Sequence, residues 1–167
     1  MKKTAVLVIF VFGLVIGLLA AALMLNLSAE GIMLKEIISP YDFEKTVKVL
    51  SDRINNAENW HVTGVIDQSA EVEGHGGKNI GKLKIIQYCS GKYAYEMLSA
   101  DERKKMSVMM PKSFAVYEKS GGRVYIALMN GAFMGKMFKG PAFQIIEDVS
   151  LEVERIMSFT NFKYSLF

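Results

Sequence analysis

Cysteine and histidine are scarce in this 167-residue chain, which contains one cysteine, Cys89, and two histidines, His61 and His75. A single cysteine cannot form an internal disulfide, so in an oxidising compartment Cys89 stays free or pairs with another chain. The sequence has no zinc-ligand spacing and no Cys-x-x-Cys-His sequence for haem attachment. These shortages exclude a disulfide framework, the usual zinc modules and covalently attached haem.

Motifs for catalysis are also missing. The chain has no phosphate-binding glycine motif, no pair of catalytic carboxylates with a supporting signature and no internal repeat. Of its 20 basic residues, Lys2 and Lys3 precede a long apolar run, which leaves 18 basic against 17 acidic residues in the remainder. A nearly neutral remainder lacks the basic surface that nucleic acid requires. We therefore expect no nucleic-acid partner and a non-enzymatic role.

Charged residues are absent from the stretch 4–29, whose centre is almost purely aliphatic and aromatic. About 20 helical residues cross the hydrocarbon of a bilayer, so we expect a single transmembrane signal-anchor helix over about residues 4–27. Lys2 and Lys3 before it and Glu30 after it predict a cytoplasmic amino terminus and a domain on the extracytoplasmic side of the cell membrane. The alternative is a cleaved signal peptide, because small residues near the end of the stretch resemble a peptidase site.

The remainder of the chain is long enough for one domain with its own core but not for two. We expect a signal anchor over 1–29, a linker or first strand over 30–39, an α+β domain over 40–160 and a C-terminal tail over 161–167.

Periodicity and composition predict the order helix, strand, strand, helix, hairpin, helix within this domain. Apolar residues recur at helical spacing over 42–57 and 143–157, and Ser39 or Asp42 can cap the first of these helices. β-Branched and aromatic content predicts strands over 60–66, 82–89, 113–118 and 123–129. The residues expected in the core are Phe43, Val47, Leu50, Ile54, Val149 and Val153.

Three further segments complete the pattern. A glycine-bearing stretch over 71–81 interrupts the strands, and residues 92–106 read as a helix with a break near Ser99. Gly121 and Gly122 predict a hairpin turn between the last two strands. Four or five strands with helices on one side favour a two-layer α+β sandwich built on a mixed sheet.

Several strings in this order resemble the domain-of-unknown-function 302 family over roughly residues 40–157. They are "FEKTVKVLSDRI", "WHVTGVID", "KLKIIQYCSGKYAYEML", "MMPKSFAVYE" and "VYIALMN". The resemblance implies a compact α+β fold and a homodimer, with no established chemistry. It also implies a cysteine at Cys89 followed by Asn-Pro and a second cysteine after Pro111, where this chain has Ser90-Gly91 and Lys112. A two-cysteine redox role is therefore not expected here.

The segment 130–142 is the expected contact surface for a partner. Its glycines allow it to adapt, while aromatic and thioether side chains supply apolar area for a membrane-protein partner or a small apolar ligand. The residues expected to make these contacts are Phe133, Met134, Met137 and Phe138.

Methionine is abundant, with 11 residues in the chain, and thioethers suit Cu(I) or haem iron. The residues that could ligate copper or haem are His61, His75, Cys89, Met109, Met129 and Met134. Methionines also fill irregular cores, and Cys89 at a strand-to-helix junction reads as a packing residue, a ligand or a nucleophile. The sequence thus favours an exported, membrane-tethered, homodimeric binding or assembly module of unidentified ligand and cofactor. A haem- or copper-binding redox protein is the alternative, and an enzyme using Cys89 comes third.

Overall fold

The computed structural model describes residues 2–164, with side chains described for 4–23 and 31–164, and the chain divides into two compact units after Met33. The first unit is one helix, α1 (Lys2–Met33). Its segment Thr4–Leu23 is long and apolar enough to cross a membrane, and none of that segment is buried. The helix continues past the expected end near residue 27 and leads directly into the first strand.

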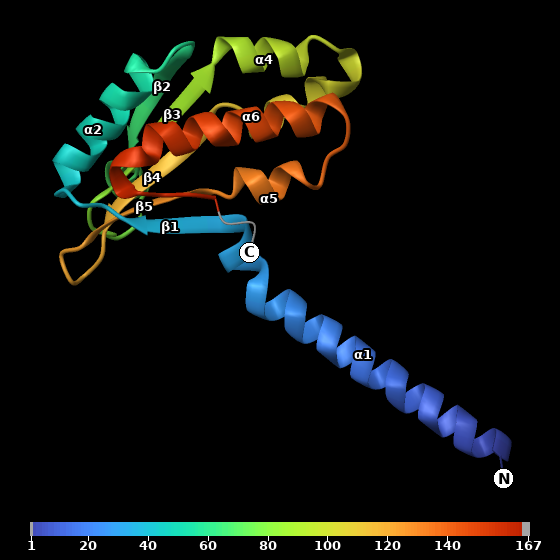
Figure 1. Ribbon diagram of the computed structural model, residues 1–167. Coiled ribbons are helices and arrows are strands. Elements are labelled where there is room, and N and C mark those ends of the chain that lie inside the picture. Colours follow the sequence, from blue (N-terminus) through green and yellow to red (C-terminus); the bar gives the residue numbers. More distant parts are fainter. Residues whose placement is uncertain (1, 165–167) are drawn as a thin grey trace. The chain divides into compact units, whose positions relative to one another are not determined.

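The second unit contains a five-stranded sheet in the order β1-β5-β4-β3-β2 (Figure 1). The strands are β1 (Leu34–Ile38), β2 (Trp60–Asp67), β3 (Leu83–Ser90), β4 (Lys112–Glu118) and β5 (Val124–Met129). The segment left open as a linker or first strand is therefore an edge strand from Leu34. All four strand pairings are antiparallel, whereas the sequence predicted a mixed sheet. The prediction is therefore wrong about the direction of the strands. A parallel pair needs a connection that carries the chain back along the sheet. The helical connection between β3 and β4 does not do this, because β4 starts at the end of the sheet where β3 finishes.

Helices cover one face of the sheet, which confirms the two-layer α+β architecture (Figure 1). The helical segments are α2 (Phe43–Asn56), α3 (Gln68–Gly74), α4 (Gly91–Leu98), α5 (Gly131–Gly135) and α6 (Pro141–Ile156), with 3₁₀ helices η1 (Asp101–Met109) and η2 (Met157–Thr160). The break near Ser99 is confirmed, since it separates α4 from η1. The short helices α3 and α5 were not predicted, because both lie in glycine-bearing segments that read as loops.

The core lies between the sheet and its helices. All six residues predicted to be buried are buried, and Leu50 and Ile54 of α2 have no exposed surface. Of the two predicted caps, Ser39 and Asp42, it is Asp42 that caps α2, because its carboxylate accepts a hydrogen bond from the Lys45 amide at 2.8 Å. In the tail expected over 161–167, Phe162 is buried in the core, and residues 165–167 lie outside the described residues.

Candidate functional site

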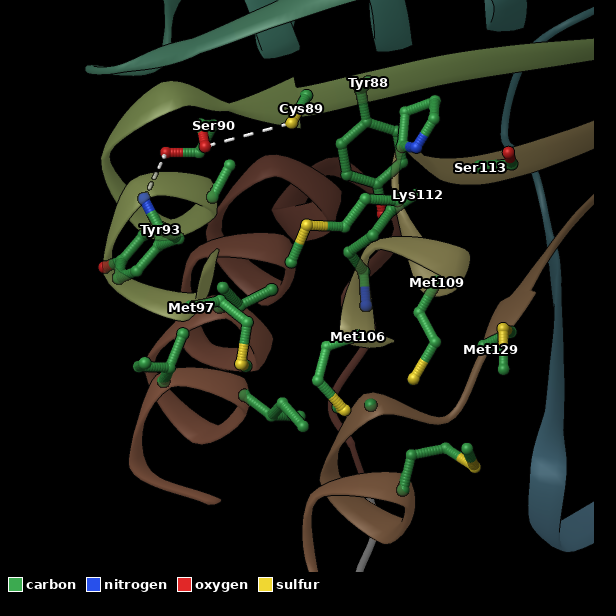
Figure 2. A pocket seen from close by; sticks show the side chains of 18 of the residues that line it. Tyr88, Cys89, Ser90, Tyr93, Met97, Met106, Met109, Lys112, Ser113 and Met129 are labelled. Atoms are coloured by element: carbon green, nitrogen blue, oxygen red, sulfur yellow. Dashed lines mark hydrogen bonds between the residues drawn. The ribbon is translucent and has the colours of Figure 1, made fainter. Parts of the chain in front are cut away.

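A pocket of about 250 Å³ lies between one end of the sheet and the helical layer (Figure 2). Its walls come from the strands β2, β3 and β4, from the helices α4, η1 and α6, and from the end of β5 with the segment that joins it to α6. The lining residues are Trp60, Tyr88, Cys89, Ser90, Tyr93, Ala94, Met97, Met106, Val108, Met109, Met110, Pro111, Lys112, Ser113, Met129, Gly131, Met134, Ile145, Ile146 and Val149. The pocket is thus an apolar hollow next to the main core.

Strand register places two polar side chains together on the helix-covered face. Tyr88 in β3 and Lys112 in β4 are directly paired, and paired residues of antiparallel strands project from the same face. Tyr88 is fully buried and stacks on Phe114 with ring centroids 4.6 Å apart. Figure 2 shows Lys112 beside Tyr88, projecting into the space lined by Met106 and Met109. Both side chains therefore present their polar ends to the pocket.

These polar ends have no protein partners among residues 2–164. The Tyr88 hydroxyl and the Trp60 indole Nε1 are buried without a hydrogen-bond partner. Within the same residues, no hydrogen bond or ion pair is formed by the Lys112 ammonium, although the side chain is only half-buried. Nearly all buried polar groups in proteins are hydrogen-bonded, so two unpartnered buried groups beside a half-buried lysine form an unusual cluster.

Burial determines the charge states of this cluster. It lowers the pKa of Lys112 to about 8, because the ammonium is poorly solvated and has no compensating anion. It also raises the pKa of Tyr88 well above its ordinary value, so the phenol stays protonated at neutral pH. At pH 7 the pocket therefore contains a cation and a neutral hydroxyl donor.

Gly131 lies close both to this cation and to α6. A Cβ atom added to Gly131 would stand 3.7 Å from the Lys112 Nζ and 2.5 Å from the Ser150 Oγ of α6. The close approach of α5 to α6 thus depends on a residue without a side chain, and the ammonium of Lys112 reaches this point of contact.

Methionines form much of the remaining wall. Six of the 11 methionines line the pocket, and Met97 and Met106 are themselves buried. Thioether side chains are flexible and polarisable, so such a wall adapts to the shape of a bound apolar group. Val108, which is 88% exposed, and Met129, which is 43% exposed, mark the side that is open to solvent.

The expected contact residues of the segment 130–142 lie in different environments in the structure. Met134 lines the pocket, whereas Met137 is 65% exposed outside it. Phe133 and Phe138 are half-buried, and Phe138 packs against the core. The segment contains α5, which packs on α6. Its first two glycines therefore allow these two helices to approach closely, apart from any flexibility that they give the segment.

The residues considered for copper or haem are only partly brought together. Cys89, Met109, Met129 and Met134 all border the pocket. His61 is exposed on β2 opposite Cys89 in the strand register. His75 is exposed at the end of α3, where its Nδ1 contacts the Glu71 carbonyl oxygen at 2.8 Å.

No group of three or more His, Cys, Asp or Glu side chains that could hold a metal occurs in the described part of the chain. The Lys112 ammonium would also oppose a metal cation at the cluster of methionines. Cys89 itself is half-buried and is free of any disulfide.

Sequence reasoning did not single out Lys112, Tyr88 or Trp60 as a site. A signal was present, since Lys112 precedes the predicted strand 113–118 and is in phase with its buried residues Phe114 and Val116. A lysine on the buried side of a strand is uncommon and indicates a special environment.

Comparisons with known proteins show the family and the fold. The family model described as "Domain of unknown function DUF302" matches residues 35–159. No curated protein matches the chain. A crystal structure of an uncharacterized conserved DUF302 protein from Bacillus stearothermophilus is similar, with a TM-score of 0.67 and 15% identity, over 77% of this chain and 98% of that chain. The helical layer and the sheet thus belong to a shared fold, and the chain is a member of the domain-of-unknown-function family DUF302.

Proposed function

We propose that this protein is a membrane-tethered, non-enzymatic binding module whose pocket holds a small ligand with an apolar body. The observation that carries the proposal is the space of about 250 Å³ that remains beside an otherwise close-packed core. An engineered cavity of about 150 Å³ in another protein binds benzene, so this pocket has room for a ligand larger than one aromatic ring. Apolar walls with a few convergent polar groups are typical of small-molecule sites.

Trp60 provides a direct test, because it is the only tryptophan in the chain and it lines the pocket. Titration of the full-length protein in lipid nanodiscs with 3-phenylpropionamide should change the Trp60 fluorescence and should saturate. Ala94 on α4 also lines the pocket, so Ala94→Phe should fill the space and abolish the response. The matched control is Ala70→Phe at an exposed position of α3, which should leave the response unchanged. An unsaturable response, or equal binding by Ala94→Phe, would contradict the proposal.

The tether is the helix α1, and we place the domain on the extracytoplasmic side. The length and apolar composition of Thr4–Leu23 support the tether, and Lys2 and Lys3 support the orientation. Protease added to intact spheroplasts should digest the domain. Protection of the domain until the membrane is broken would contradict the orientation, and release of the domain in soluble form would indicate a cleaved signal peptide.

We also propose that the module is a homodimer, as the family resemblance implies. Support comes from exposed apolar side chains on one side of the edge strand β1, where Leu34 is 50% exposed and Ile38 is 53% exposed. Sedimentation in a density-matched detergent should give twice the mass of the chain. Ile38→Glu should shift the mass toward the monomer, whereas Val65→Glu at the opposite edge of the sheet should not. A monomer for the unmodified chain would contradict the proposal.

A further inference from the structure

We infer that the ligand is a small monocarboxylate with an apolar body, whose carboxylate is held by the Lys112 ammonium and the Tyr88 hydroxyl. The inference rests on the proposed function of the pocket and specifies the chemical class of the ligand. Its basis is the juxtaposition of a cation and a hydroxyl on paired strand positions, at one end of an apolar hollow.

The polar groups of the pocket favour a ligand rich in acceptors. Lysine ammonium and indole N–H groups are donors only, and the neutral phenol of Tyr88 donates as well. Neither Trp60 Nε1 nor the Tyr88 hydroxyl has a partner within residues 2–164. No carboxylate lines the pocket among the residues that the structure describes, so the protein offers the ammonium of Lys112 no counter-charge there. An anionic acceptor brought by the ligand would satisfy this arrangement, because charge-assisted hydrogen bonds are the strong ones.

The charge of the site favours a monoanion. Lys112 is the single charged side chain that lines the pocket within the described residues. A carboxylate would be neutralised by one ammonium, whereas a phosphate dianion would bring a second negative charge with no partner into an apolar space. An uncompensated charge in such a space is strongly disfavoured. The charge balance therefore selects a carboxylate over a phosphate.

The rest of the pocket favours an alkyl or aryl body of modest size. The walls beyond Tyr88 and Lys112 are formed by side chains such as Met97, Met106 and Ile145. Thioethers also make favourable contacts with aromatic rings. A ligand with a phenyl ring and a short arm that ends in a carboxylate places each part against a matching surface.

The charge state of Lys112 adds a pH dependence. Burial lowers the pKa of Lys112 to about 8, and a bound carboxylate would raise it by stabilising the ammonium. Affinity should therefore fall as pH rises above about 8. The other titratable groups at the pocket are Tyr88 and Cys89 from β3 and Tyr93 from α4, and Tyr164 lies near enough to act on the charge of Tyr88. The lining residues from η1, α5 and α6 carry no titratable side chain. Burial raises the pKa of all three tyrosines, so none of them becomes an anion in this range.

The experiment compares two ligands of matched shape on the full-length protein in lipid nanodiscs. Calorimetric titration with 3-phenylpropionate and with its neutral amide should show at least tenfold tighter binding of the carboxylate at pH 7. Lys112→Met should remove this preference, and Tyr88→Phe should reduce it. The control is Lys105→Met, which removes an exposed lysine of η1 that does not line the pocket.

The outcomes separate this inference from the proposed function. If the amide binds as tightly as the carboxylate and Ala94→Phe blocks both, the pocket binds ligands but the carboxylate inference is wrong. If neither compound binds, the proposed function and the inference both fail. If the preference survives in Lys112→Met, the carboxylate is held elsewhere and the inference is overturned.

Discussion

Replacement of Lys112 by methionine should stabilise the folded protein at neutral pH, although it changes a residue of the proposed binding site. The substitution removes a charge that has no partner among residues 2–164 and keeps an unbranched side chain of similar length. In the folded protein the pKa of Lys112 is about 8, compared with 10.5 for a freely solvated lysine. The folded state therefore binds this proton less tightly than the unfolded state does.

The size of the effect follows from that difference. A pKa shift of one unit corresponds to 1.36 kcal/mol. The lowering of the Lys112 pKa would therefore reduce the free energy of unfolding at neutral pH by about 3 kcal/mol if the group were fully desolvated. The side chain is half-buried, and solvent screening reduces the expected gain for Lys112→Met to about 2 kcal/mol at pH 7. Between pH 8 and 10.5 the unfolded state binds more protons than the folded state at this position. The contribution of Lys112 to the free energy of unfolding therefore rises with pH in this window.

Urea denaturation followed by Trp60 fluorescence measures both effects. Lys112→Met should have the higher free energy of unfolding at pH 7, and its advantage should shrink as the pH is raised toward 10. Lys105→Met, in which an exposed lysine is replaced, should match the unmodified protein throughout. Equal or lower stability of Lys112→Met at pH 7 would refute the claim that this ammonium is poorly solvated and lacks a counter-charge.

Three further predictions concern the fold around the site. Leu50→Asp places a charge at a fully buried position and should unfold the domain at a cost of several kcal/mol, visible as the loss of its thermal transition. Gly131→Ala should lower the free energy of unfolding by about 1 to 3 kcal/mol, because the new methyl group would stand 2.5 Å from the Ser150 Oγ; an unchanged urea midpoint would show that α5 can move away from α6. Met137→Ala should leave the melting temperature unchanged and weaken co-purification of a membrane partner, whereas Phe138→Ala should lower the melting temperature because Phe138 packs against the core.

Much of the fold was predictable because its signals are local. The apolar spacing of α2 and α6, the Asp42 cap and the alternation along the strands each depend on residues close together in the sequence. The short helices α3 and α5 escaped prediction because each has too few residues to show a helical periodicity and each overlaps a glycine-bearing segment. α5 packs on α6, whereas α3 buries none of its residues. At Gly131 and Gly135 the glycine is needed for close approach to α6, which no local pattern reveals.

The site was predicted only in part for a related reason. Met109, Met129 and Met134 were selected for their thioether chemistry, and the fold does bring them to one pocket. His61 and His75 were selected for their chemistry as well, but they lie on exposed positions elsewhere. The pairing of Tyr88 with Lys112 depends on the register between β3 and β4, and residues 24 positions apart acquire it only in the folded sheet.

Methionine methyl groups offer the most direct test of ligand binding in this pocket. In the full-length protein labelled at its methionine methyls and placed in lipid nanodiscs, titration with 3-phenylpropionate should shift and saturate the resonances of the pocket residues. These residues are Met97, Met106, Met109, Met110, Met129 and Met134. Met137, which is exposed, and Met157, which is buried in the core away from the pocket, should not shift. Equal shifts at all of these methyls, or no saturable shift at the pocket methyls, would contradict the account.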